Sequence, residues 1–376
     1  MLDIKKILGR SWHILWNYRT LWVFGFILAL TVGASNGGGG NNSRYSANDG
    51  ERDNGPAGIH APQDWQGLQG DTPQEKLNDA FAQLGAGIAE LRAEYPVEFQ
   101  MGIAAAITLF VMIVVLSLVG AVLRYVAETS TIRMVNEYEE TGVKVGFRQG
   151  WKYGWSRVSW RLFFINLLVH LPSFFMLVLV ILVAWWIVSA ALSGVEATLI
   201  TSLIAGIGLV FLFGFITVIL MTVLYLVRDF AWRMAILEDK GVGDSFRSAF
   251  ALLKRNWKNA GLMWLVVLGL KIAWALVFFL LMLPLLVISI VTMIGGILAA
   301  LAPALVTAGL ASLLSAPDFW PWVFAAIIGL PFFFVVAFSP ILLVSGWGYI
   351  YQSNVWTLTY RELKAIETVA PVVVNE

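Results

Sequence analysis

The feature that most constrains this chain is a unit that occurs three times, in which a basic, aromatic-rich amphipathic stretch leads directly into a long apolar run. The three copies are residues 4–30, 143–171 and 242–270. A basic amphipathic helix with Trp and Phe on one face lies at the headgroup level of a bilayer. About 20 apolar helical residues cross the hydrocarbon core. Each copy therefore predicts a surface helix joined to a membrane-spanning helix.

The apolar residues elsewhere also gather into blocks of membrane-spanning length. Of the 376 residues, 59% are hydrophobic and 13% are charged, which is roughly half the charged fraction of a soluble domain. Residues 101–123, 162–195, 197–227 and 319–360 contain no Asp, Glu, Lys or Arg. Lipid admits only helices and closed barrels, and these blocks lack the alternating pattern of barrel strands. The sequence thus predicts an all-α fold, a polytopic transmembrane helical bundle.

The repeated unit divides the chain into three tandem hairpins, which together supply about six spans. The second and third copies align at an offset of 99 residues, so that Phe147 and Arg148 correspond to Phe246 and Arg247. Repeats that share one orientation are related by an axis along the membrane normal. The predicted hairpins are residues 1–125, 126–228 and 229–363, with a cytoplasmic tail at 364–376.

Two segments depart from the simple hairpin pattern. The connector 35–98 is polar and rich in Gly, Asn and Asp as far as residue 70, which predicts a flexible external loop. From Thr72 to about Glu94 the apolar residues then have the spacing of an amphipathic helix. In the third hairpin, Gly295-Gly296 divide a 56-residue apolar block. We expect residues 297–316 to re-enter the membrane or to lie in its outer interface, because a full crossing would spoil the even number of spans.

The distribution of positive charge predicts the orientation of the spans. Most of the 25 Lys and Arg residues lie at the N-terminus, in the connectors 124–161 and 228–258, and near the C-terminus. The connector 35–98 instead holds four basic and ten acidic residues. Lys and Arg near membrane ends favour the cytoplasmic side. We therefore predict that both termini and both basic connectors lie in the cytoplasm.

The basic residues of the three surface helices are the candidate lipid-headgroup contacts. Each Lys or Arg near an anionic leaflet contributes on the order of 1 kcal/mol of attraction. The candidates are Lys5, Lys6, Arg10, Arg148, Lys152, Arg157, Arg247, Lys254, Arg255 and Lys258. Beside them, Trp and Phe residues recur every three or four positions, which is the spacing of one helix face. A purely mechanical role, in which these helices anchor the topology, explains the same pattern.

Two ionisable residues lie within predicted spans, and they define a candidate intramembrane polar site. Lys271 lies about 15 Å along the fifth span at 1.5 Å per residue, and His170 lies at nearly the same depth in the third, one turn after Asn166. Ionisable groups inside a membrane are costly and often functional. Two interpretations stay open: a functional site, or a Lys271 that reaches the interface or bonds a carbonyl near Pro284 while His170 sits neutral in helix packing.

No pattern in the chain indicates catalysis or a cofactor. The absence of Cys excludes disulfides, thiolate metal sites and cysteine nucleophiles. The three His residues, His13, His60 and His170, lack the spacing of a metal site, and no serine lies in a nucleophile elbow. We therefore expect a protein that is not an enzyme and that has no metal and no cofactor. A net charge of +1 gives no indication of a nucleic-acid partner.

Two stretches carry a resemblance to a known group of proteins. Residues 241–257, beginning Gly-Val-Gly-Asp-Ser-Phe-Arg, and residues 357–363, Thr-Leu-Thr-Tyr-Arg-Glu-Leu, resemble uncharacterised six-span bacterial families allied to the membrane domain of glycerophosphodiester phosphodiesterase. The resemblance implies a six-span, multi-pass fold in the bacterial inner membrane. In those enzymes a separate soluble barrel carries the chemistry, and this chain has no such barrel, so the resemblance implies no enzymatic activity here.

The sequence favours a non-enzymatic membrane-embedded scaffold or lipid-interacting module. Its expected partners are lipids, with anionic headgroups on the cytoplasmic side, and a protein partner within a membrane complex. The alternative is a transporter or permease-like conduit for a lipid or small solute, which would need a polar cavity converging on Lys271, His170 and Asn166. A lipid-modifying enzyme would need His or carboxylate clusters at the interfaces.

Overall fold

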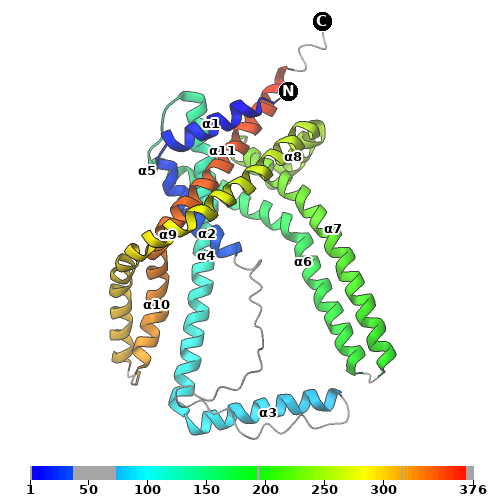
Figure 1. Ribbon diagram of the computed structural model, residues 1–376, viewed down its shortest axis with the longest axis vertical. Helices are drawn as coiled ribbons and strands as arrows, with labels where there is room; N and C mark the ends of the chain where they lie inside the picture. The colour runs from blue at the N-terminus through cyan, green and yellow to red at the C-terminus, as the bar shows by residue number, and fades with distance from the viewer. Residues whose placement is uncertain (1, 37–72, 193–194, 315, 318, 370–376) are drawn as a thin grey trace. The chain divides into compact units, whose positions relative to one another are not determined.

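A computed structural model describes residues 2–36, 73–192, 195–314, 316–317 and 319–369, and within these ranges all regular structure is helical. The helices are α1 (Ile4–Asn17), α2 (Thr20–Asn36), α3 (Pro73–Glu94), α4 (Pro96–Thr141), α5 (Phe147–Gly154), α6 (Arg157–Leu192), α7 (Glu196–Leu237), α8 (Val242–Arg255), α9 (Trp257–Leu313), α10 (Trp320–Ala337) and α11 (Ser339–Val369) (Figure 1). The all-α prediction is confirmed. The predicted flexible loop up to residue 70, with His60, and the end of the tail from residue 370 lie outside the described residues.

Five helices are long and apolar enough to cross a membrane, namely α4, α6, α7, α9 and α10. The pair α1 and α2, bent by 99° at its joint, adds a sixth if it counts as one span. In the most apolar window of each helix, between 0 and 22% of the residues are buried. Hydrophobic side chains that no other part of the protein covers are typical of a surface in contact with lipid. The chain is therefore a multi-pass membrane protein.

A short helix precedes a long apolar helix at each of the three predicted copies. The short helices α1, α5 and α8 lead into α2, α6 and α9 with two or fewer intervening residues. At the first joint Tyr18 ends α1: its backbone N–H donates to the carbonyl of Ile14, 2.9 Å away. The buried Tyr18 hydroxyl donates to the carbonyl of Val145 and accepts from its N–H, at 2.8 and 2.6 Å. One side chain thus fixes the turn after α1 to the segment that leads into α5.

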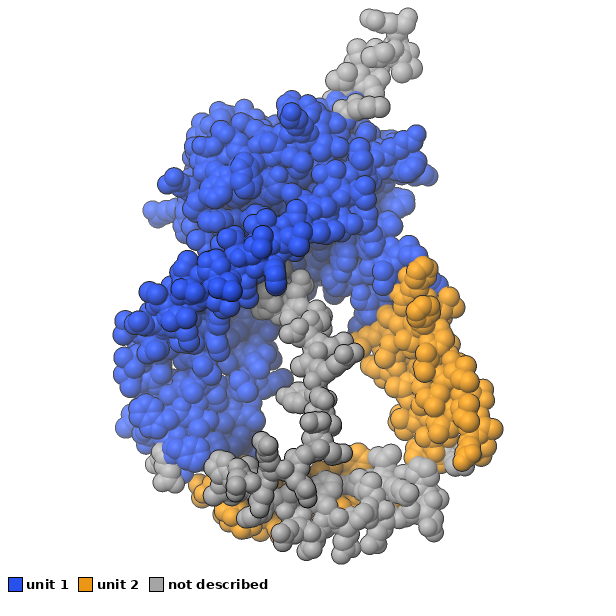
Figure 2. Space-filling model, in the orientation of Figure 1, with its two compact units in different colours: residues 1–35, 101–174, 216–376 blue, residues 36–100, 175–215 orange. Residues whose placement is uncertain are grey.

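The described residues separate into two compact units, coloured in Figure 2. Unit 1 comprises residues 1–35, 101–174 and 216–376, and unit 2 comprises residues 36–100 and 175–215. Unit 2 contains the hairpin made by the end of α6 and the start of α7. Gly206 lets these helices approach closely, since a Cβ there would lie 2.8 Å from Val183.

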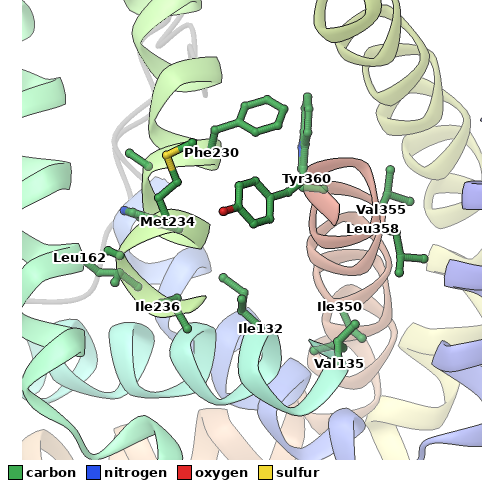
Figure 3. Packing of buried hydrophobic residues seen from close by; sticks show 14 of the residues in the cluster. Ile132, Val135, Leu162, Phe230, Met234, Ile236, Ile350, Val355, Leu358 and Tyr360 are labelled. Carbon is green, nitrogen blue, oxygen red and sulfur yellow. The ribbon is translucent and has the colours of Figure 1, made fainter. Parts of the chain in front are cut away.

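The main hydrophobic core belongs to unit 1, where α4 and α7 continue past their uncharged blocks and α11 joins them. α4 contributes Ile132 and Val135, α7 contributes Phe230 and Met234, and α11 contributes Val355, all 2% exposed or less (Figure 3). Side chains of α1, α6, α8 and α9 complete this cluster. The basic connectors of the sequence analysis therefore begin as helical extensions that bury apolar side chains.

A pair of glycines sets the crossing of α2 and α11. A Cβ on Gly346 would lie 2.5 Å from the carbonyl carbon of Gly25, and a Cβ on Gly25 would lie 2.8 Å from the Gly346 oxygen. No side chain fits between backbones this close, and small residues at such crossings are typical of membrane helices. This contact joins α2, near the start of the chain, to α11, the last described helix.

The predicted break at Gly295-Gly296 is wrong, because α9 continues without interruption through both glycines to Leu313. Gly296 serves packing instead: a Cβ there would lie 2.9 Å from the carbonyl oxygen of Phe333 in α10. The Thr292 hydroxyl also donates to the carbonyl of Ala337 at 2.6 Å. Residues 297–313 therefore form the second part of α9, which runs antiparallel to α10 (Figure 1).

The crossing at Gly346 makes a prediction about stability. Gly346→Ala should destabilise the purified protein by about 1–3 kcal/mol, the usual cost of overpacking, although alanine is the better helix former. Thermal melting followed by tryptophan fluorescence in detergent micelles measures this. The matched control is Gly269→Ala in α9, where an added Cβ meets nothing within 4 Å. Equal melting temperatures for the two variants would contradict the proposed backbone contact.

Candidate functional site

The short helices bury small residues and expose aromatic ones. The buried positions include Ser11 in α1, Gly150 and Gly154 in α5, and Ser245 and Ala249 in α8. At Gly154 a Cβ would come within 2.3 Å of the carbonyl oxygen of Val126, so α5 lies directly on α4. The predicted surface helix α5 thus attaches to α4 through close backbone contact.

Large aromatic side chains are exposed on or beside each short helix. Trp12 and Trp16 of α1 are 47 and 40% exposed, Phe147 and Trp155 beside α5 are 44 and 63% exposed, and Phe250 and Trp257 beside α8 are 53 and 66% exposed. The Trp151 ring packs between those of Phe147 and Trp155, with centroids 5.9 and 6.2 Å away. Amphipathic rings of this kind concentrate at membrane–water interfaces.

All ten candidate headgroup contacts are exposed. Two of them form ion pairs: Arg10 with Glu139 at 2.7 Å, and Arg255 with Glu367 at 3.0 Å. Among the described residues, the other eight have no ion pair to an acidic side chain. They are Lys5, Lys6, Arg148, Lys152, Arg157, Arg247, Lys254 and Lys258. Cations without an acidic partner are available to an external anion.

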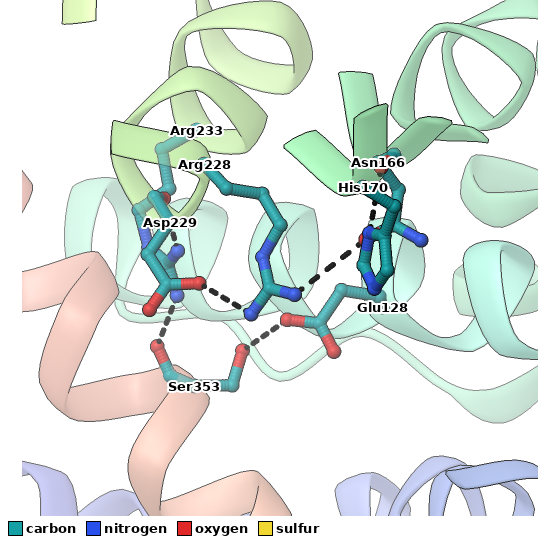
Figure 4. Close-up of polar contacts among 7 residues, drawn as sticks. All are labelled: Glu128, Asn166, His170, Arg228, Asp229, Arg233 and Ser353. Carbon is teal, nitrogen blue, oxygen red and sulfur yellow. Dashed lines mark hydrogen bonds and ion pairs between the residues drawn. The ribbon is translucent and has the colours of Figure 1, made fainter. Parts of the chain in front are cut away.

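A buried ionic cluster lies in unit 1, with Glu128 from α4 and Arg228, Asp229 and Arg233 from α7 (Figure 4). Arg233 is 2% exposed. Its guanidinium donates to the carbonyl oxygens of Asp229 and of Ser353, the latter at 3.0 Å. The Ser353 hydroxyl in turn donates to Glu128 at 3.0 Å. Two acids and two bases balance in charge, which lowers the large cost of burying any one of them.

Arg228 forms the more accessible part of this cluster. Its guanidinium lies over the rings of Tyr225 and Trp232, 4.9 and 4.8 Å from their centroids. It also pairs with Asp229 at 3.2 Å. A cation over an aromatic face gains about 0.5–2 kcal/mol, depending on its desolvation. Arg228 is therefore held by its neighbours.

The three predicted intramembrane residues are not brought together. Asn166 and His170 lie one turn apart in α6, and the His170 Nδ1 is 2.8 Å from the Asn166 carbonyl oxygen. The Asn166 side-chain oxygen accepts from Arg228 at 3.5 Å, so both residues join the edge of the ionic cluster. Lys271 is exposed on α9. Within the described ranges, no hydrogen bond or ion pair connects it to Asn166 or His170.

A polar crevice of about 490 Å³ opens where the ends of α1, α4, α7 and α11 meet. Its lining contains four cations and four carboxylates. The charged lining residues are Lys6, Arg10, Glu139, Glu140, Glu238, Arg361, Glu362 and Lys364. Several of these charges already pair across the crevice, for example Arg361 with Glu140 at 3.2 Å. Because the numbers of cations and carboxylates are equal and several of them pair, this crevice has no strong excess of either charge.

Glu238 is the central acid of the crevice. Lys240 and Lys364 each lie 2.8 Å from one of its carboxylate oxygens, and the Tyr360 hydroxyl donates to it. Burial by itself raises the pKa of this carboxyl. The hydrogen bonds from Lys240, Lys364 and Tyr360 outweigh burial and lower the pKa from its ordinary value of 4.5 to about 2. The ionised form of Glu238 is therefore strongly favoured in the folded protein.

Sequence reasoning missed the buried ionic cluster and the crevice. Glu128 and Arg233 fall in connectors that are polar on average, and the positive-inside argument uses only their charge. A helical signal was nevertheless present, because Tyr125, Ile132 and Val135 recur at helix-face spacing within the first connector. Among the described residues, no group of three or more His, Asp and Glu side chains could hold a metal ion.

Comparison with known proteins now gives the chain its family. A family model described as a family of unknown function, DUF7544, matches residues 10–354. The chain belongs to this family. No curated protein and no solved structure matches it. The DUF7544 match runs from α1 into α11 and so covers the short helices and all five apolar helices. The resemblance to the membrane domain of glycerophosphodiester phosphodiesterase stays a prediction.

The ionic cluster makes a prediction about Arg233. Arg233→Met should destabilise the protein by about 3–5 kcal/mol, because it leaves Glu128 without its buried cation and two carbonyl oxygens without a donor. Unfolding by titrated denaturant in micelles measures the loss. Arg247→Met, at an exposed arginine of α8, should change the free energy of unfolding by less than about 0.5 kcal/mol. A loss of similar size in both variants would contradict the assigned role.

The crevice makes a prediction about acid. A carboxyl whose pKa is lowered on folding stabilises the folded state fully above its unfolded pKa. The stabilisation from Glu238 should therefore be complete above about pH 5 and should fade as the pH falls from 4.5 towards 2. Glu238→Gln removes it at every pH. Melting temperatures of both proteins, measured from about pH 7 down to about pH 2, should converge at the acid end. Curves that stay parallel would count against this assignment.

Proposed function

We propose that this member of the DUF7544 family is a non-enzymatic, lipid-interacting scaffold of the bacterial inner membrane. In this proposal α1, α5 and α8 lie in the cytoplasmic interface and bind anionic headgroups. The observation behind this proposal is that the short helices expose aromatic side chains next to cations that have no acidic partner among the described residues. Rings such as Trp155 favour the interface, and cations such as Lys152 and Lys254 add about 1 kcal/mol each near an anionic leaflet.

The position of the two chain ends supports a shared side for both termini. The start of α1 and the end of α11 line the same crevice, through Lys6 and Lys364. The positive-inside rule favours the cytoplasm for this side. The acidic connector that leads to α3 would then face the opposite side of the membrane.

The contacts of Lys271 offer no support to a solute conduit. Such a conduit would need polar groups that converge within the membrane, and Lys271 is exposed on α9 without a contact to His170 or Asn166 in the described part of the chain. The buried polar groups instead pair with one another around Arg233. A protein partner in a membrane complex remains part of the scaffold proposal.

Topology can be tested directly, because the chain contains no native cysteine. Single cysteines introduced as Lys152→Cys and Lys254→Cys should both react with an impermeant maleimide only in inverted vesicles. Glu196→Cys, at the start of α7, should react only in intact spheroplasts. Labelling of the Lys152 and Lys254 positions from opposite sides would overturn the proposed arrangement.

Headgroup binding can be tested with a double variant. Lys152→Gln with Lys254→Gln should weaken the preference for phosphatidylglycerol over phosphatidylcholine by up to about thirtyfold, which corresponds to about 2 kcal/mol. Quantitative lipid mass spectrometry of protein purified from mixed vesicles measures the preference. The control is Arg92→Gln, an exposed cation of α3, for which no change is expected. An unchanged preference in the double variant would refute headgroup binding by α5 and α8.

A further inference from the structure

A second cavity lies in unit 1 between α4 and the bend that joins α5 to α6. Its volume is about 430 Å³, within the usual range for small-molecule sites. The lining comes from three places: Leu118 to Val126 on α4, the bend at residues 154–157, and Ser159 to Phe163 on α6. No Asp or Glu is among these lining residues. The cavity is therefore apolar with a single charged group, Arg157.

The cavity lies at the boundary between the apolar and charged parts of both helices. On α4 the uncharged block ends at Leu123, and on α6 it begins at Leu162. Leu118, Val122 and Phe163 form its walls on the apolar side of this boundary. Arg157 and Ser156 lie on the charged side. A ligand that fits this arrangement has an apolar chain and a polar, anionic end.

The polar end of the cavity carries groups without partners. The Ser156 hydroxyl oxygen is buried and has no hydrogen-bond partner, and Arg157 is exposed with no ion pair within the described ranges. Both residues stand at the start of the 36-residue helix α6, whose first N–H groups lack carbonyl partners and carry partial positive charge. A buried hydroxyl with no partner is costly, and an anionic oxygen would satisfy it.

The walls of the cavity are fixed by packing in the described structure. Gly154 lies against α4, where a Cβ would collide with Val126. The Ser159 hydroxyl donates to the Gly154 carbonyl and lies 3.1 Å from the Thr129 hydroxyl. Trp155 and Trp160, 63 and 61% exposed, also line the cavity. Such rings favour the interface between lipid and water, which supports a position of the cavity at the level of the headgroups.

We infer that one anionic glycerophospholipid occupies this cavity. Its phosphate would accept hydrogen bonds from Arg157, from Ser156 and from the first amides of α6, and one acyl chain would lie against Leu118, Val122 and Phe163. This inference rests on the proposed function, because it assumes that α5 lies in the headgroup region. It adds a single saturable site to the broader attraction of the short helices.

Native mass spectrometry of the full chain, delipidated and then titrated with phosphatidylglycerol or phosphatidylcholine, tests the site. The wild type should retain one phosphatidylglycerol. Arg157→Gln should lower this affinity by about tenfold or more, the loss expected for one hydrogen bond to a charged group. Ala121→Phe should block the cavity for both lipids. The controls are Lys144→Gln, an exposed cation outside the cavity, and Ala106→Phe, an exposed position of α4.

Each outcome separates this inference from the broader proposal. The site is supported if the wild type retains one phosphatidylglycerol, Arg157→Gln weakens its binding and Ala121→Phe removes it. Both controls and the melting temperatures should be unchanged. Equal occupancy by both lipids indicates unspecific lipid and overturns it. If both cavity variants still retain the single bound lipid, the inference is also overturned. The proposed function still stands in that case if the Lys152 and Lys254 double variant weakens the preference for phosphatidylglycerol. A failure of both experiments rejects both.

Discussion

The burial of apolar side chains at one end of the long helices is the interaction on which the rest of this structure depends. Within lipid, apolar surface gains little by leaving its surroundings, so spans associate through close packing more than through the hydrophobic effect. In unit 1 the strongest burial occurs where α4 and α7 continue past their uncharged blocks and α11 joins them, for example where Phe230 meets Trp356 with ring centroids 5.5 Å apart. There the ordinary hydrophobic effect applies, and it fixes which helix ends lie together.

That core also explains why charged side chains are tolerated near it. Glu128, Asp229, Arg228 and Arg233 follow the uncharged blocks within one or two turns, so the same packing that buries Phe230 and Met234 encloses them. Their opposite charges stabilise one another, and carbonyl oxygens such as that of Ser353 accept hydrogen bonds from the cluster. Farther out, Glu238 pairs with two lysines in a wetter crevice. Along these helices, the apolar blocks that face lipid are thus followed by a core with paired charges, and then by exposed ion pairs.

The parts that sequence predicted well are those encoded by neighbouring residues. Uncharged runs identified the spans, and a basic aromatic stretch before each of three runs corresponds to α1, α5 and α8. The parts that it missed depend on contacts between distant segments. Gly295-Gly296 suggested a break, yet glycine in a lipid-covered helix also permits close approach, as Gly296 does toward Phe333. Lys271 and His170 shared a predicted depth, but periodicity carries no information on which helices are neighbours.

The contact between Gly25 and Gly346 has a consequence for biogenesis. It connects α2, near the start of the chain, to α11, the last described helix, and α11 supplies one wall of the hydrophobic core. During translation, a side chain such as Phe230 therefore lacks its final neighbour Trp356 until the ribosome has made α11. Pairings this far apart in the chain form slowly. Assembly of this protein is thus a late event that follows membrane insertion, and truncations near the C-terminus should be cleared by quality-control proteases.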